Sequence, residues 1–445
     1  MVKHQIIAAT FGFALIAGTA QAGPEQVSVQ EAVRRGLEQS NLARAATFQA
    51  EAARSGARAA ALHYLPSLTF EESWSRSNLP VNTFMMKLNQ GRFDALNDMR
   101  ALNNPSPVTD FRTSFTLEQP LLVPGAWAGS TVARRDAARQ EAVAELTRQQ
   151  IAFQIFQQYL EVHKAKAQLS AADKALDEAR ERARQAVVRT AAGLGLKSDE
   201  LRAATHLATM EQQKISASNN LTLARMQLAL VTGGQPGDEL DAGAPLQLQP
   251  PQDLGRLISS AQQDRRDLKA AEQGKERADA AVLQVRSGFL PSVGAFGSWQ
   301  MNDSTTPFGR EHDAWSVGVA LRWNLFDGFR TWHGDGQARA NRAAALEQLQ
   351  QTRKEISYQV HEAWLRRQEA EKRHQVAAAA LQSAEETVRL LGKRFDNALA
   401  TMVELLDAQS ALNQARANVV ESEAHLSLAT GHLYHRAGTF LKEVQ

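Results

Sequence analysis

Few side chains in this chain have the types and spacing that catalysis or metal binding requires. His432 and His435 lie three positions apart, which places both imidazoles on one face of a helix, but no acidic or thiolate partner is evident beside them. Gly193 and Gly195 follow a predicted helix rather than a strand, so they do not form a dinucleotide-binding turn. We find no phosphate-binding loop, no Gly-x-Ser-x-Gly turn and no His-Glu-x-x-His motif. We therefore expect no metal site, no cofactor and no enzyme activity.

The composition excludes further kinds of site. The 445 residues include no cysteine, which rules out disulfides, thiolate zinc sites, a cysteine nucleophile and a lipid-anchored N-terminal cysteine. A formal net charge of +2 argues against a nucleic-acid partner, which would normally require a strong basic excess. The length alone suggests about three domains of ~150 residues. With only 6% aromatic residues, the composition instead favours long helices packed closely through small side chains.

The elements that position the remaining candidate residues begin after a targeting segment. Residues 1–22 are typical of a signal peptide, with Lys3 at its start, an apolar run over 6–17 and a small-x-small cleavage site at 20–22. The apolar run is too short for a spanning helix, which needs ~20 apolar residues. No later stretch is apolar enough to cross a membrane as a helix. We expect an exported protein, and any membrane-spanning part of it must be built from β-strands.

The chain contains two copies of one unit. The motif Tyr-Leu-Pro-Ser-Leu at 64–68 recurs as Phe-Leu-Pro-Ser-Val at 289–293, whereas landmarks further along are offset by about twenty residues less. The first copy therefore carries an extra stretch within roughly 78–108, where we expect a loop. A segment rich in Gly and Pro, 233–255, separates the copies.

This repeat predicts the organisation of the chain. We expect a signal peptide (1–22), a first repeat (23–232), a linker (233–255) and a second repeat (256–445). Each repeat should contain a first helix, a β-hairpin (about 64–120 and about 289–325) and a coiled-coil helical hairpin (about 126–232 and about 331–438).

The helical hairpins are unusually long. Residues 130–192 contain neither Gly nor Pro, and neither do residues 337–391. A helix of 63 residues would span ~95 Å, which a compact domain cannot contain. Apolar and small residues alternate spacings of three and four from Ala203 to Val231 and again from Leu405 to Leu433, which predicts coiled-coil packing.

The predicted strands have one apolar and one small or polar face. Odd-numbered positions from Trp315 to Leu325 are apolar, and the positions between them are small or polar. Such alternation suits a lipid-facing wall with a wet interior, but a soluble hairpin packed on helices would show it too. Four strands cannot close a barrel, since the smallest membrane barrels have ~8, and open edges are not tolerated in lipid. If these strands span a membrane, several chains must share one barrel.

Taken together, these features resemble the TolC family of outer-membrane efflux and secretion channels. The resemblance rests on the signal peptide, the tandem copies, Leu-Pro-Ser at the start of each first strand, the 119–122 Gln-Pro-Leu-Leu exit and the two coiled-coil hairpins. It covers the whole mature chain. It implies a mainly α fold with membrane β: a homotrimer with a shared 12-stranded β-barrel, four strands from each protomer, and a long α-helical coiled-coil barrel.

The resemblance also implies roles for the turns of the two helical hairpins, which we call the tips. In the family an Arg precedes a Gly-Leu turn, followed by Ser/Thr-Asp, and these tips meet a periplasmic adaptor. The corresponding residues of this chain are Arg189, Gly193, Leu194, Ser198 and Asp199 in the first tip, and Arg394, Ala398 and Leu399 in the second. We expect Gly193 to permit the reversal and Ser198 or Asp199 to cap the returning helix. The second tip has Ala398 in place of the Gly, which leaves its turn open.

Acidic side chains near the second tip ring the periplasmic aperture in the family, and Glu404 and Asp407 fall at those positions. Three-fold symmetry would bring these like charges together and favour cations. A solvated acidic helix face is the alternative. Some members fasten this end with an aromatic hydroxyl and an Arg that reach the first-copy acid. Phe395 lacks the hydroxyl and Ala400 lacks the charge, so we expect that clasp to be absent.

Two functions follow as hypotheses. The first is a passive exit duct in the Gram-negative outer membrane that extends into the periplasm, contacts outer-membrane lipid, and works with a periplasmic adaptor and an inner-membrane pump of RND or ABC type. The second is a soluble periplasmic coiled-coil structural or adaptor protein. Neither involves nucleic acid.

Overall fold

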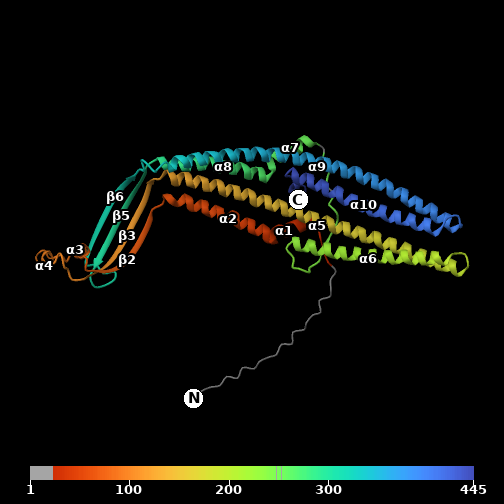
Figure 1. Ribbon diagram of the computed structural model, residues 1–445, viewed down its shortest axis with the longest axis horizontal. Helices are drawn as coiled ribbons and strands as arrows, with labels where there is room; N and C mark the ends of the chain where they lie inside the picture. Colours follow the sequence, from red (N-terminus) through yellow and green to blue (C-terminus); the bar gives the residue numbers. More distant parts are fainter. Residues whose placement is uncertain (1–23, 247, 252, 445) are drawn as a thin grey trace, which may run out of the picture.

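The protein is an elongated strip with strands at one end and two helical tips at the other (Figure 1). The computed structural model describes residues 24–246, 248–251 and 253–444. The signal peptide predicted over 1–22 lies outside these residues.

The two repeats are built from matching elements. The first contains β1 (Glu25–Val27), α1 (Val29–Gln39), α2 (Asn41–Ala61), η1 (Leu62–Tyr64), β2 (Ser67–Ser77), α3 (Pro80–Asn89), α4 (Ala95–Arg100), β3 (Val108–Leu122), α5 (Pro124–Ala191) and α6 (Lys197–Val231). The second contains β4 (Leu240–Ala242), α7 (Leu254–Asp264), α8 (Arg266–Arg286), η2 (Ser287–Phe289), β5 (Ser292–Asp303), β6 (His312–Arg322), α9 (Arg330–Asp396), α10 (Met402–Arg436) and α11 (Phe440–Val444). Apart from α3, α4 and α11, every element has a counterpart, so the predicted tandem repeat is confirmed.

Three local expectations need correction. The first helix of each repeat is two helices, because the chain is extended at Ser40 and at Arg265. The extra stretch of the first repeat is a folded excursion rather than a loop: Pro80 begins α3, and Asp94 caps α4. The segment predicted as a linker contains β4, which pairs in parallel with β1.

No helix in the described ranges combines the length and the apolar character needed to cross a membrane.

The long helices α5 and α9 contain 68 and 67 residues, which corresponds to ~100 Å each. The positions that alternate along α6 from Ala203 to Val231 and along α10 from Leu405 to Leu433 are all buried or half-buried. They face neighbouring helices, as coiled-coil packing requires. The coiled-coil prediction is therefore confirmed.

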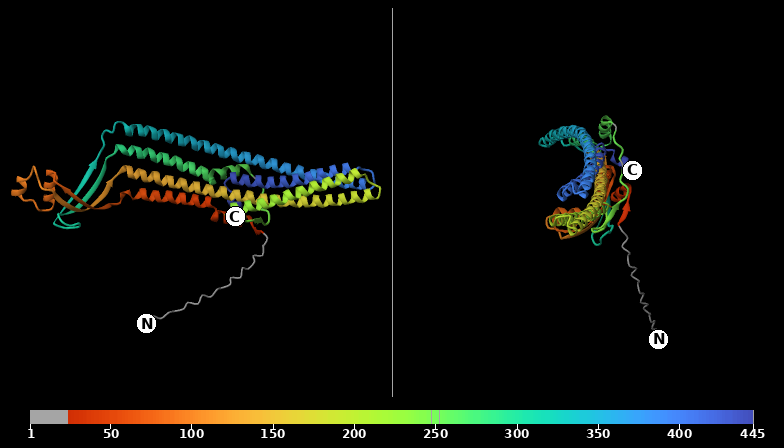
Figure 2. Two further views of the ribbon diagram at one scale, coloured as in Figure 1. Left: turned by 60° about the horizontal axis from the view of Figure 1, so that its bottom comes forward. Right: turned by 90° about the vertical axis from the view of Figure 1, so that its right-hand side faces the viewer.

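The long helices form one curved layer (Figure 2). Near the strands the order across the layer is α2, α5, α8, α9, and near the tips it is α6, α5, α10, α9. The sheet has the corresponding order β2, β3, β5, β6, with antiparallel neighbours. At every level, therefore, one side of the strip belongs to the first repeat and the other side to the second.

The main core lies halfway along the helices, where β1 and β4 cover α5. Tyr159 is fully buried, and its hydroxyl donates to the carbonyl oxygen of Ala244 at 2.8 Å. Beside it, Asp241 accepts from Lys166 at 2.8 Å and from Arg225 at 3.2 Å. Burial acts to raise the pKa of Asp241, but these two cations hold it below its ordinary value. The charge of this carboxylate is thus neutralised inside the protein.

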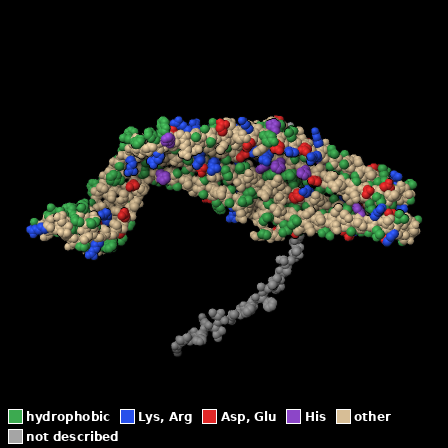
Figure 3. All heavy atoms as spheres, in the orientation of Figure 1, with side chains coloured by type: hydrophobic (Ala, Val, Ile, Leu, Met, Phe, Trp, Pro, Cys, Tyr) green, Lys and Arg blue, Asp and Glu red, His purple; other side chains and the backbone are tan. Residues whose placement is uncertain are grey.

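The sheet exposes its apolar face. Most large side chains that share this face are exposed, and the others are half-buried. Leu68, Phe70, Trp74, Leu117, Trp315, Val317, Val319 and Leu321 are exposed, and Phe115 and Trp299 are half-buried. The apolar residues Trp323 and Leu325, predicted to continue the fourth strand, lie beyond the end of β6 and are exposed as well. In Figure 3, apolar side chains are visible at the end of the strip that carries α3 and α4. A face of this kind needs an apolar surrounding.

Glu72 interrupts the apolar face, and the turn between β5 and β6 explains how it is accommodated. The turn folds back over the sheet, so that Phe308 stacks on Phe70 with ring centroids 6.3 Å apart. The carboxylate of Glu72 accepts a hydrogen bond from the Thr113 hydroxyl and one from the Phe308 backbone N–H at 3.4 Å. The carboxylate is therefore hydrogen-bonded rather than left bare on an apolar surface.

Candidate functional site at the helical tips

The two tips lie side by side at the end remote from the sheet (Figure 1). They share a small apolar cluster in which Phe395 from the second hairpin is 7% exposed, packed with Ala186 and Ala203 of the first and Met402 and Leu405 of the second. The cluster fixes one tip against the other.

Both tips make the same backbone turn. Gly193 has a φ of +73° and Ala398 a φ of +59°, so each helix ends at a left-handed residue. The N–H of Leu194 donates to the carbonyl of Arg189 at 2.8 Å, and the N–H of Leu399 donates to the carbonyl of Arg394 at 2.7 Å. The sequence left the turn of the second tip undetermined because Ala398 replaces the Gly. The structure shows that the second tip adopts the same turn as the first, although alanine lacks the conformational freedom of glycine.

The two arginines at equivalent positions do different things. The Arg189 guanidinium lies 4.6 Å from the centroid of the Phe395 ring, and its Nη1 donates to the Phe395 carbonyl oxygen at 3.3 Å. Arg189 thus joins the first tip to the second. The Arg394 Nη2 donates at 3.2 Å to the carbonyl oxygen of Leu399, within its own turn. Phe395, which lacks the hydroxyl of the family clasp, instead offers its ring face to the Arg189 cation.

The returning helices begin differently, and the predicted cap of α6 is wrong. The residue before α6 is Leu196, which offers no side-chain hydrogen bond, and Ser198 and Asp199 already lie inside the first turn. In the second tip the Thr401 hydroxyl accepts from the N–H of Glu404 at 3.3 Å, and the Glu404 carboxylate accepts from the N–H of Thr401 at 2.7 Å. This capping box was readable as Thr-x-x-Glu in the sequence.

Glu404 therefore has a local partner, whereas Asp407 lies one turn further along α10 and is exposed. The hydrogen bonds from the Thr401 backbone N–H and hydroxyl lower the pKa of Glu404, which keeps the carboxylate charged. Both candidates for the aperture are exposed to water at the same end as the tips.

The first tip carries a group of exposed apolar side chains, which we call the apolar tip surface. Its members come from the end of α5, the turn and the start of α6: Val187, Val188, Leu194, Leu196 and Leu201. At the turn of the second tip, Leu399 is similarly exposed. Exposed apolar groups of this kind commonly mark a protein contact. No periodic pattern predicts them, because they are exposed rather than packed against a neighbouring helix.

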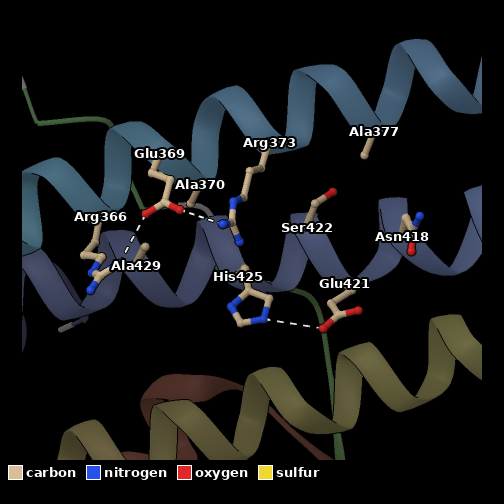
Figure 4. Close-up of a pocket in the computed structure, with 10 residues that line it drawn as sticks. All are labelled: Arg366, Glu369, Ala370, Arg373, Ala377, Asn418, Glu421, Ser422, His425 and Ala429. Atoms are coloured by element: carbon tan, nitrogen blue, oxygen red, sulfur yellow. Dashed lines mark hydrogen bonds and ion pairs between the residues drawn. The ribbon is translucent and has the colours of Figure 1, made fainter.

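Elsewhere in the second hairpin, a hollow of about 530 Å³ lies between α9 and α10 (Figure 4). Glu369 pairs with Arg373 at 2.7 Å and with Arg366 at 3.4 Å, and Glu421 lies 3.7 Å from the His425 ring. The pairs of Glu369 neutralise part of the charge on the α9 side of the hollow.

His432 and His435 are packing residues. Both pack on the ring of Phe153, with ring centroids 4.6 Å and 4.5 Å away. Burial lowers the pKa of His435 to about 4, so the ring is neutral at physiological pH. Within the described part of the chain, no group of three or more His, Asp or Glu side chains is placed to hold a metal ion.

A tandem repeat of two strands and a long helical hairpin, arranged as a curved strip, is the fold of outer-membrane channel proteins. The solved structures with this fold include a membrane protein from Pseudomonas aeruginosa (19% identity, 93% of this chain and 91% of that one, TM-score 0.80) and the outer membrane protein VceC from Vibrio cholerae (20%, 92% and 96%, 0.77). A structure of CusC has the same fold (18%, 98% and 99%, 0.79).

The family model of outer membrane efflux proteins matches residues 33–234 and 257–439, one match in each repeat. The chain belongs to the outer membrane efflux protein family. Among curated proteins it is similar to the outer membrane efflux protein BepC of Brucella suis, at 27% identity over 189 residues. The match covers about 40% of each protein. Family membership places the protein in the outer membrane of a Gram-negative cell, which does not fit the soluble periplasmic alternative.

Proposed function

We propose that three copies of this chain form a channel-tunnel that serves as the exit duct of a tripartite efflux or type I secretion system. Substrate would enter from a periplasmic adaptor and an inner-membrane pump and pass outward without energy from the duct itself. The identity of the substrate would then be set by the pump rather than by this protein.

The observation that carries the proposal is that the strip has two long open sides. On one side lie β2, α2 and α6, and on the other lie β6 and α9. Strand edges in lipid must be paired, so β2 of one copy needs β6 of the next. Since the strip is curved, side-to-side joining closes a ring, and three copies supply twelve strands.

On each of the two open sides, an exposed apolar side chain lies at the same distance along the helix from its tip. Ile215 on α6 is 62% exposed and Val376 on α9 is 70% exposed. Each lies 22 residues from the left-handed residue of its own tip, Gly193 or Ala398. Because both hairpins point the same way, these two side chains should meet between neighbouring copies.

Cysteine pairing tests this closure directly, because the chain has no cysteine of its own. The double variant Ile215→Cys/Val376→Cys should give a covalent trimer on a non-reducing gel after mild oxidation. Each single variant serves as a control and should give at most a dimer. A double variant that remains monomeric while its thiols react with a maleimide would contradict the ring.

We further propose that the adaptor contacts the apolar tip surface together with Arg189, Ser198 and Asp199, and that the second tip contributes Arg394, Ala398 and Leu399. Charge reversal at Asp199 should weaken resistance or secretion without loss of trimers. Leu194→Asp should do the same through the apolar surface. Ile215→Asp, on the open side rather than at the tip, should instead reduce the yield of trimers. Unchanged transport in both tip variants would refute this contact.

Glu404 and Asp407 are our candidates for an acidic ring at the periplasmic aperture. Three copies would place six carboxylates around the opening, which favours cations. The double variant Glu404→Gln/Asp407→Asn should lower cation selectivity in planar-bilayer reversal-potential measurements. A selectivity equal to that of the wild type would count against the ring.

A further inference from the structure

A hollow on the polar face of the sheet, near the junction with the helices, takes no part in the proposed docking. We propose that it is a contact site for aromatic cations in transit through the duct. The inference rests on the proposed function, since it requires the polar face to line the water-filled interior.

The hollow surrounds one aromatic side chain on an otherwise small or polar face. Phe296 of β5 pairs across the sheet with Glu118 of β3 on one side and Gly318 of β6 on the other. Its ring lies over Gly318 so closely that a Cβ at that position would come within 2.6 Å of the ring. Even so, Phe296 is 43% exposed. One side of the ring is therefore seated on the sheet while the rest is open to the interior.

An aromatic ring that covers a glycine also stabilises a strand pair, and this accounts for part of the arrangement. It does not account for the charges. Glu118 and Arg322 line the same hollow, and neither forms an ion pair with any residue that the structure describes. Within the described residues, an acid and a base that are both free of an ion pair therefore lie beside an exposed ring.

The dimensions of the hollow suit a drug-sized molecule. Its volume is about 420 Å³, and Ser67, Gln119 and Gly294 complete its wall. Ligand pockets usually measure ~300–1,000 Å³ and combine an apolar surface with a few polar groups. The absence of a side chain at Gly318 lets the Phe296 ring lie on the sheet, and the absence of one at Gly294 leaves room in the hollow beside it.

The side chains define the ligand class. The ring of Phe296 offers its face to a second aromatic ring or to a cation. Glu118, directly across from it, attracts a positive charge, and Arg322 discourages a second one. An aromatic molecule with a single positive charge suits all three side chains, Phe296, Glu118 and Arg322. The site is open and shallow, so it should bind weakly and release quickly, as a passage requires.

Block of single-channel current in planar bilayers tests the site. Tetraphenylphosphonium is the aromatic probe, and tetrabutylammonium is an aliphatic cation of the same charge. Phe296→Leu should raise the half-blocking concentration of tetraphenylphosphonium at least fivefold and leave that of tetrabutylammonium unchanged. Glu118→Gln should raise both severalfold. Ser298→Ala, on the same strand and face two residues away, is the matched control and should change neither.

The outcomes separate this inference from the proposed duct. Channels of normal conductance with the same half-blocking concentration in the wild type and in Phe296→Leu would overturn the site and leave the duct intact. A second measurement uses Phe296→Cys with a charged, membrane-impermeant methanethiosulfonate reagent. Reaction in the reconstituted protein supports a water-lined polar face. Failure to react, with normal reaction after unfolding, would overturn the duct and the site together.

Discussion

The two tips have the same backbone turn and different chemistry. The first makes the turn with Gly193, starts its returning helix without a side-chain cap, and carries the apolar tip surface. The second makes the turn with Ala398 in a conformation that costs a non-glycine residue energy, and it adds the capping box of Thr401 and Glu404. Duplication thus preserved the geometry of the tips. The second tip is stabilised by its own residues, while the first leaves apolar groups for a partner.

The largest expected effect comes from the side chain that joins the tips. Phe395→Ala removes the ring at the centre of their shared cluster, and truncation of a buried Phe typically costs ~3–5 kcal/mol. The tips should then open independently, with hydrogen exchange of amides in both turns faster by roughly 100-fold. Leu399→Ala, at an exposed position of the same turn, is the control. Equal protection in the two variants would mean that the tips are held together elsewhere.

Exchanging the turn residues should move the two tips in opposite directions. Ala398→Gly relieves a left-handed alanine and should stabilise the second tip, while Gly193→Ala should destabilise the first by a similar ~1 kcal/mol. Nothing lies within 4 Å of a Cβ at Gly193, so its effect would arise from the backbone alone. Hydrogen exchange of the amides flanking each turn measures both changes. If both variants shift protection in the same direction, the equivalence of the turns is disproved.

The caps should distinguish the tips further. Thr401→Ala removes the capping box and should destabilise the start of α10 by ~1 kcal/mol. Ser198 was a candidate cap for α6, but its hydroxyl does not cap the helix. Ser198→Ala should therefore leave the stability of the start of α6 unchanged. Exchange of the first-turn amides of each helix is the measurement. A larger effect at Ser198 than at Thr401 would reverse our assignment.

The smallest effect is a dependence on pH that only the second tip should show. Since hydrogen bonds lower the pKa of Glu404 in the folded protein, its contribution is complete above the unfolded value, ~4.3, and is lost as the pH falls through the lower folded value. A nitroxide attached at Ala400→Cys should become more mobile in that acidic window. Adding Thr401→Ala should remove the dependence. If the mobility of the nitroxide changes equally with and without Thr401→Ala, a group other than Glu404 causes the pH dependence.

Much of the fold was predictable because it is periodic or repeated. The Gly- and Pro-free stretches marked α5 and α9, the three-and-four spacing marked the packed side of α6 and α10, and the offset between motifs marked the tandem repeat. The assignment of side chains to the two faces of the sheet also follows from alternation. The exception is Glu72, whose place on the apolar face is explained by a turn 236 residues away.

The site was less predictable because its contacts join distant segments. Arg189 and Phe395 could be named from the sequence, but their stacking depends on how α5 and α9 pack. The cap of α6 was misplaced because Ser198 and Asp199 favour helix starts generally, and the helix begins just before them at Lys197. Conversely, the Thr401 box was present as a local motif and could have been found.

The pairing of β1 with β4 has a consequence for how the protein is made. Glu25 aligns with Leu240, so β1 finds its partner only after more than two hundred further residues have been synthesised. Contacts of such long sequence separation form late, because the loop between them must close first. The first repeat therefore has to cross the periplasm without its final strand pairing. It should depend on chaperones until the second repeat arrives, and a chain truncated before Leu240 should be degraded rather than stored as a half-finished channel.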